Sequence, residues 1–204
     1  MTLKLTKTEL RSQQTRLFQF RRYLPTLQLK KAMLQFEVMA ADMEISRLAD
    51  ELTLSRKQVE SFAPFFLEKV SVDLLLNAEI LHVKKRYENI AGVEIPIFDR
   101  VVFREPEYFL FDTPPWTDRA TELTRDMISV REKINIAIEK KRALQKELRD
   151  VSIRVNLFEK ILIPRAQGNI SKIRIFLGDQ QLAAVAQAKV AKQKILQRKE
   201  REEA

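Results

Sequence analysis

The chain lacks cysteine altogether and contains very little histidine. Of its 204 residues, none is cysteine and only His82 is histidine. Without cysteine there is no disulfide and no cysteine-ligated metal, and one histidine cannot build a histidine metal cluster or a Ser-His-Asp triad. We interpret His82 as a structural residue at the end of an apolar helical stretch (residues 74–81). We expect no cofactor, no metal site and no catalytic centre, so the chain is predicted not to be an enzyme.

Glycine is scarce as well. The three glycines, Gly92, Gly168 and Gly178, are far apart and cannot form a glycine-rich phosphate loop. Because glycine is the usual residue of tight turns and helix ends, a chain this poor in it makes few turns. The sequence therefore predicts few, long elements.

Long apolar runs are also missing. No stretch of about 18 apolar residues occurs, and residues 1–7 are polar and basic. We therefore expect neither a signal peptide nor a transmembrane helix, and no direct insertion into a membrane. We expect any association with a membrane to be peripheral, through partners or through the surface.

What the chain does have is charge, with an excess of positive charge. It contains 37 Lys and Arg against 28 Asp and Glu, a formal net charge of +9. Such an excess favours acidic partners, namely nucleic acid, anionic lipid or an acidic protein surface. The acidic residues are interspersed throughout, however, so a well-solvated helical surface is the simpler interpretation.

The first third of the chain carries a heptad repeat. Two interleaved series, each with a period of seven, alternate in steps of three and four, which is the a/d seam of a coiled coil. The first series is Leu10, Leu17, Leu24, Lys31, Val38, Ile45, Leu52 and Val59. The second series is Phe20, Leu27, Leu34, Ala41, Leu48, Ser55 and Phe62.

The C-terminal half carries a second seam of similar length. It runs through Leu123, Met127, Val130, Ile134, Ala137, Lys141, Leu144, Leu148, Val151, Val155, Phe158 and Leu162. The phase then slips by one residue to Ala166, Ile170, Ile173 and Leu177, which is a stutter and predicts a local change of winding near Pro164. Beyond Leu177 the seam weakens to alanines.

Two seams of similar length predict an antiparallel two-helix coiled coil formed within the chain. The alternative is that each helix pairs with a second copy or with a partner. We expect a continuous, bent helix at Pro25, because the heptad phase continues across it, and a kink or break at Pro64.

The middle of the chain differs from its flanks. Residues 93–98 and 101–104 are β-branched and aromatic, which predicts a small β-hairpin turning at Asp99-Arg100. Residues 108–111 are expected to add an extended piece, with Trp116 as a plug between hairpin and coiled coil. Thr117 or Asp118 is the expected N-cap of the second helix. The fold class is thus mainly α, with segments 1–87 (helix), 88–116 (hairpin) and 117–204 (helix).

One segment is more specific than its heptads. Residues 154–165, Arg-Val-Asn-Leu-Phe-Glu-Lys-Ile-Leu-Ile-Pro-Arg, closely resemble the C-terminal motif of the D subunit of V-type (vacuolar and archaeal) ATPases. Weaker similarities lie at Thr6-Lys7 with Leu10, at residues 27–34 and at residues 92–96. The resemblance covers nearly the whole chain in the right order.

The resemblance implies a non-catalytic rotor shaft. Such a shaft would stand inside a ring of catalytic A and non-catalytic B subunits, bind the small stalk protein known as the F subunit, and join a linker to the membrane rotor. It would lie in the cytoplasm, peripheral to the membrane. The candidate shaft-motif or partner-contact residues are Lys30, Lys31, Arg154, Asn156, Glu159, Pro164 and Arg165.

Two other interpretations remain at this stage. The basic charge also fits a coiled-coil arm that binds nucleic acid, although the aromatic residues are not interleaved with lysines on one face. A generic coiled-coil scaffold is the other, although a scaffold seam does not require the run at 154–165. We expect no nucleic acid as a partner.

Overall fold

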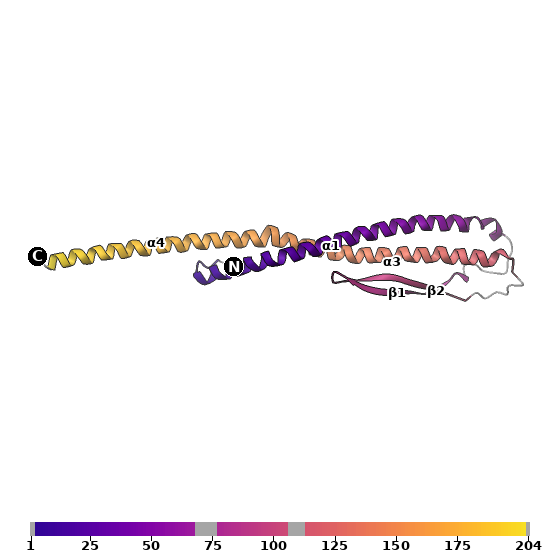
Figure 1. Cartoon of the computed structure of the whole chain (residues 1–204), viewed down its shortest axis with the longest axis horizontal. Helices are drawn as coiled ribbons and strands as arrows, with labels where there is room; N and C mark the ends of the chain where they lie inside the picture. The colour runs from indigo at the N-terminus through magenta and orange to yellow at the C-terminus, as the bar shows by residue number, and fades with distance from the viewer. Residues whose placement is uncertain (1–2, 68–76, 106–112, 203–204) are drawn as a thin grey trace. The chain divides into compact units, whose positions relative to one another are not determined.

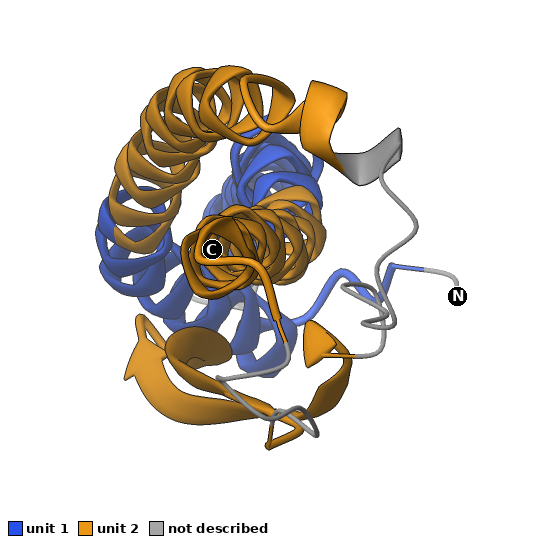
Figure 2. Ribbon diagram, turned by 90° about the vertical axis from the view of Figure 1, so that its right-hand side faces the viewer, with its two compact units in different colours: residues 1–29, 152–204 blue, residues 30–151 orange. Residues whose placement is uncertain are grey.

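The computed structural model describes residues 3–67, 77–105 and 113–202. Its elements, in chain order, are α1 (Lys7–Glu60), a short 3₁₀ helix (Ala63–Leu67), β1 (Ile80–Ile90), β2 (Val93–Phe103), α3 (Trp116–Leu157), a π-helical turn (Phe158–Leu162) and α4 (Ile163–Glu202) (Figure 1). Two long helical arms flank one β-hairpin, so the predicted fold class is confirmed. The chain divides into unit 1, residues 1–29 and 152–204, and unit 2, residues 30–151 (Figure 2).

The helices pair within the chain and run antiparallel. In unit 1, the Phe20 ring meets the Phe158 ring edge-on, with centroids 5.4 Å apart. In unit 2, Lys30 pairs with Glu147, and Glu44, further along α1, pairs with Lys140, earlier in α3. The residue number in α3 falls as the number in α1 rises, which is the signature of antiparallel helices. The expectation of pairing within the chain is confirmed.

The two predicted seams form the contact between the helices. Their most buried members in unit 2 are Leu34, Ala41, Leu48, Val130, Ala137, Leu144 and Val151. Those in unit 1 are Val155, Ala166, Ile170 and Ile173. The seam ends where it was predicted to weaken, because residues 179–198 of α4 are all exposed. Burial of the two facing apolar stripes is therefore the main favourable term for each unit.

The predicted change of winding is a π-helical turn. From Val155 to Ile170 the seam completes four turns in 15 residues, about 3.75 residues per turn, which is more than the 3.6 residues per turn of an α-helix. The Ile163 N–H accordingly bonds to the Phe158 carbonyl, the i→i−5 pattern of a π-helix, which places more residues in the turn. This wider turn lies just before Pro164, so the proline ring is accommodated without ending the helix.

The other two helix prolines behave differently from each other. Pro25 lies inside α1, which is continuous, as its unbroken heptad phase predicted. At Pro64 the helix is broken: α1 ends at Glu60 and Pro64 falls in the 3₁₀ helix Ala63–Leu67. Proline disfavours the α conformation of the residue before it, which explains the end of the helix here. The first helix thus stops well short of residue 87.

The β-hairpin is longer than predicted and turns at a different place. Ile90 pairs with Val93, so the loop has two residues, Ala91 (φ 52°) and Gly92 (φ 81°). Positive φ at both loop positions is the geometry that suits the twist of a hairpin. The turn expected at Asp99-Arg100 is wrong: Lys84 pairs with Arg100 and Lys85 with Phe98, which leaves Asp99 as a bulge.

Three further expectations need correction or lie outside the description. The boundary expected between residues 87 and 88 falls inside β1, and His82, expected at the end of a helix, is an exposed residue of β1. Residues 108–111 lie outside the described part. As a division into domains, the segments 1–87, 88–116 and 117–204 stay a prediction.

The second helix begins one or two residues before its expected N-cap. Helix α3 starts at Trp116, so Thr117 and Asp118 lie in its first turn and are not caps. Thr117 is 1% exposed and its hydroxyl has no hydrogen-bond partner among the described residues. Two prolines precede the start, and their fixed φ suits the beginning of a helix. The Trp116 ring stacks on Phe65, with centroids 5.8 Å apart.

Candidate partner-binding surfaces

Lys30 is bound within the chain. Its Nζ lies 2.6 Å from Oε1 of Glu147 on α3, and both side chains are about one-third exposed (32% and 30%). A Cβ placed on Gly92 would lie 3.7 Å from the same Nζ, so the tip of the hairpin reaches this ion pair. Lys30 therefore connects three elements of unit 2. Lys31, the next residue, is half-buried at its seam position.

The hairpin of unit 2 is fastened to α3 along its length. Lys85 of β1 donates to Glu139 at 2.6 Å, and the Lys133 ammonium lies 5.6 Å from the centre of the Phe98 ring. The hydrogen bond to Glu139 raises the pKa of Lys85 above its ordinary value, because it favours the charged ammonium. Figure 1 shows α3 between α1 and the hairpin. Sequence reasoning gave no signal for these contacts.

Arg125 of α3 holds the open end of the hairpin. Its guanidinium donates two hydrogen bonds to the Asn77 carbonyl, at 3.0 and 2.6 Å, and one to the Arg104 carbonyl at 2.6 Å. It also lies over the Phe103 ring, 5.4 Å from its centre. Asn77 precedes β1 and Arg104 follows β2, so one side chain joins both ends of the hairpin to the helix.

The motif at 154–165 divides into an inner and an outer set. Val155 and Phe158 face α1 in the seam of unit 1. The predicted site residues of the motif are instead exposed: Arg154, Asn156, Glu159, Pro164 and Arg165. No hydrogen bond or ion pair joins any of their side chains to another described residue. The motif thus offers several exposed, uncommitted polar side chains around the π-helical turn.

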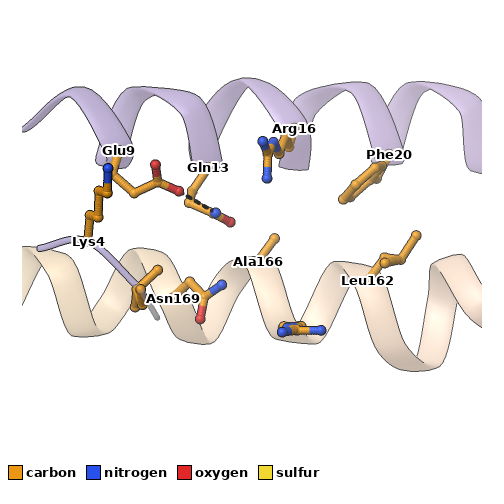
Figure 3. A pocket seen from close by; sticks show the side chains of 10 residues that line it. Lys4, Glu9, Gln13, Arg16, Phe20, Leu162, Ala166 and Asn169 are labelled. Atoms are coloured by element: carbon orange, nitrogen blue, oxygen red, sulfur yellow. Dashed lines mark hydrogen bonds between the residues drawn. The ribbon is translucent and has the colours of Figure 1, made fainter. Parts of the chain in front are cut away.

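A groove lies next to this motif in unit 1 (Figure 3). It has a volume of about 690 Å³ and lies between the start of α1 and the start of α4. Gln13 is 7% exposed and donates to Glu9 at 2.8 Å, so an otherwise apolar seam contains a polar layer here. Arg16, Arg165 and Lys4 also line the groove. Of the predicted site residues, Arg165 alone lies in it.

The predicted site residues do not converge on one centre. Lys30 and Lys31 belong to unit 2, and residues 154–165 belong to unit 1. Among the residues that the structure describes, no group of three His, Cys, Asp or Glu side chains is arranged to hold a metal ion. No helix within the described ranges is long and apolar enough to cross a membrane.

Comparison with known proteins gives a consistent result. The family model for the D subunit of ATP synthase matches residues 9–193. The D subunit of the V-type ATP synthase from Chlamydia abortus is 44% identical over 202 residues, covering 98% of this chain and 97% of that protein. The protein of the same name from Borreliella burgdorferi is 38% identical over 196 residues, covering 96% of each chain.

Proposed function

The chain belongs to the D-subunit family of ATP synthases, and from that membership we propose that it is the central rotor shaft of a V-type ATPase. In this role it transmits torque between a ring of A and B subunits, where the nucleotide chemistry takes place, and the membrane rotor that moves ions. It binds the small F subunit and a linker to that rotor. It performs no catalysis and lies peripheral to the membrane.

The observation that carries this proposal is the paired seam together with the family membership. A shaft must resist twisting, and two helices packed along continuous apolar stripes resist it better than a single helix does. In unit 2 the seam is reinforced by ion pairs from α1 to α3, at Lys30–Glu147 and Glu44–Lys140. These pairs oppose sliding of one helix along the other.

The exposed, uncommitted polar side chains of the motif suit contacts with a ring that are made and broken. Exposed ion pairs contribute about 0–1 kcal/mol each, so the ring could hold Arg154 or Arg165 at one step and release it at the next. A large apolar contact would not release so readily. Lys31 is the better candidate of the lysine pair, because Lys30 is already bound to Glu147.

Co-expression with the A and B subunits of the ring and the small F subunit tests the proposal. We expect one copy of this chain per ring of six subunits, a change in ATP turnover when it is included, and no turnover by the chain alone. Reversing the charge of Lys31 should alter turnover or torque in that complex. A stable homodimer that does not bind the A and B subunits but binds RNA in a salt-dependent manner would refute the shaft function. It would favour the alternative of a coiled-coil arm that binds nucleic acid.

A further inference from the structure

The groove of unit 1 lies where both helices lack a large apolar seam residue. Seven residues before Phe20 the apolar series of α1 reaches Gln13, a polar residue. On α4, a regular step of three from Leu162 would place residue 165 in the seam. The slip of phase places Ala166 there instead and leaves Arg165 exposed at the edge. A glutamine and an alanine fill less of the seam than two leucines would, and a volume of about 690 Å³ stays open.

The groove carries an excess of positive charge. Lys4, Arg16 and Arg165 line it, against Glu9 as the one acidic residue among the described residues of its wall. Three cations against one carboxylate leave an excess of two positive charges. None of the three cations forms an ion pair with a described residue. The Glu9 carboxylate already accepts a hydrogen bond from Gln13 at 2.8 Å. The groove therefore favours an anion.

The polar groups of the groove specify the kind of anion. Figure 3 shows Arg16 reaching from α1 toward α4, with Gln13 and Asn169 next to it along the groove. Arg165 comes from the opposite helix, so each helix contributes one guanidinium. A guanidinium donates two parallel hydrogen bonds to a phosphate, and the side-chain amides can donate others. A phosphate group has three acceptor oxygens and a charge of about −1.5 to −2, which matches the excess charge of the groove.

The other end of the groove is apolar. Phe20 of α1 and Leu162 of α4 face each other there, beyond Arg16 (Figure 3). The Phe20 ring is held in place by its edge-on contact with Phe158. The groove has a volume in the range of about 300–1,000 Å³ that is usual for small-molecule sites, and a phosphate ion alone would fill only a small part of it. The ligand therefore needs an apolar body as well as an anionic head.

We propose that this groove binds a phosphorylated small molecule, with its phosphate between Arg16 and Arg165 and an apolar ring against Phe20 and Leu162. The proposal goes beyond the shaft function and does not depend on it. Its test uses the free chain, in which no ring subunit competes for Arg165. Failure of the ligand to bind would refute the groove as a site and leave the shaft function untouched.

NMR titration of the free chain with ADP tests the site, because ADP carries both a phosphate head and a ring. The side-chain amide signals of Gln13 and Asn169 should shift, while that of Gln58, exposed in unit 2, should not. Inorganic phosphate, which is the head alone, and adenosine, which is the body alone, should each bind at least about tenfold more weakly than ADP. Unshifted Gln13 and Asn169 signals at millimolar ADP would overturn the proposal, as would equal affinity for inorganic phosphate and ADP.

Substitution separates this site from general attraction to a basic chain. Arg16→Ala and Arg165→Ala should each weaken ADP binding by about tenfold or more, because each removes a charged hydrogen-bond donor. Both side chains are exposed, so the helix content measured by circular dichroism should not change. The matched control is Arg22→Ala, at an exposed arginine of the same helix that does not line the groove, and it should bind ADP as the unaltered chain does. Equal weakening in Arg22→Ala would show that ADP responds only to the net charge of +9, and would overturn the proposal.

Discussion

Lys30 of α1 and Glu147 of α3 form an ion pair of 2.6 Å at the tip of the β-hairpin. The two residues are 117 positions apart in the chain, and neither belongs to the apolar series that brings their helices together. The pair therefore helps to fix the register of α1 against α3. If one helix slid along the other, the two charged groups would separate, whereas many apolar contacts of the seam would re-form.

Removal of this pair should have a small, coupled effect on stability. Lys30→Ala, Glu147→Ala and the double variant form a cycle whose coupling energy isolates the ion pair. We expect about 0.2–1 kcal/mol, because both side chains are partly exposed and are screened by water. Urea unfolding of the unaltered chain and the three variants measures this coupling energy. A coupling of zero would mean that Lys30 acts only through contacts with partners.

The two faces of α1 should differ sharply in their contribution to stability. Leu34 is fully buried in the seam, so Leu34→Ala should lower the free energy of unfolding by about 2–5 kcal/mol. Phe36, two residues away, is 70% exposed, and Phe36→Ala should change it by no more than about 0.5 kcal/mol. Equal losses of unfolding free energy in the two variants, measured by chemical unfolding, would contradict the assignment of Leu34 to the buried face of α1 and Phe36 to its exposed face.

Arg125 should control the docking of the hairpin on α3. Arg125→Ala leaves two carbonyl groups without their charged donor and should cost about 1–3 kcal/mol. Arg125→Lys should not restore the loss, because lysine lacks the planar fork that reaches both carbonyls. Hydrogen exchange of β1 and β2 amides should accelerate in both variants. Full protection in Arg125→Lys would indicate that charge alone suffices.

Lys85 should titrate differently when its acceptor is removed. Glu139 raises the pKa of Lys85 above 10.5, so the stabilisation that it contributes is present below about pH 10.5 and is lost as the pH rises through the folded pKa. In Glu139→Gln the acceptor is no longer charged, and the pKa of Lys85 should fall. NMR titration of the Lys85 side chain measures this, with Lys84 as the internal control. Identical Lys85 titration curves in the unaltered chain and in Glu139→Gln would exclude the ion pair.

The two prolines inside helical arms should respond unequally to replacement. Proline in a helix interior costs about 3 kcal/mol through its missing N–H and its clash with the preceding turn. At Pro164 the π-helical turn already accommodates the ring, whereas α1 has no such turn at Pro25. Pro25→Ala should therefore raise the melting temperature more than Pro164→Ala does. The reverse order would mean that the π-helical turn does not relieve the clash.

Much of this fold could be predicted from the sequence, because a seam is a repeated signal. Each heptad places apolar residues on the same face of the helix, so single exceptions such as Lys31 and Ser55 do not obscure the pattern. The hairpin turn could not be predicted in the same way. It depends on one backbone conformation at Ala91-Gly92. The polar pair Asp99-Arg100 resembles a turn equally well in sequence, but Asp99 forms a bulge and Arg100 pairs with Lys84.

The candidate surfaces were predicted less completely. Exposure of Arg154, Asn156 and Glu159 agrees with a partner-binding motif, but their roles stay a prediction. The engagement of Lys30 by Glu147 and the clamp by Arg125 depend on contacts between distant segments, which no local spacing encodes.

The unpaired end of α4 has a consequence for helix formation itself. Residues 179–198 are exposed on every side, and several are apolar, among them Leu182, Val185 and Ile195. A helix of this length without tertiary contacts is marginal in water, since nucleation is costly and each further residue adds little. In the isolated chain this end should interconvert between helix and coil, and circular dichroism of the free chain should show less helix than the same chain held within an assembly.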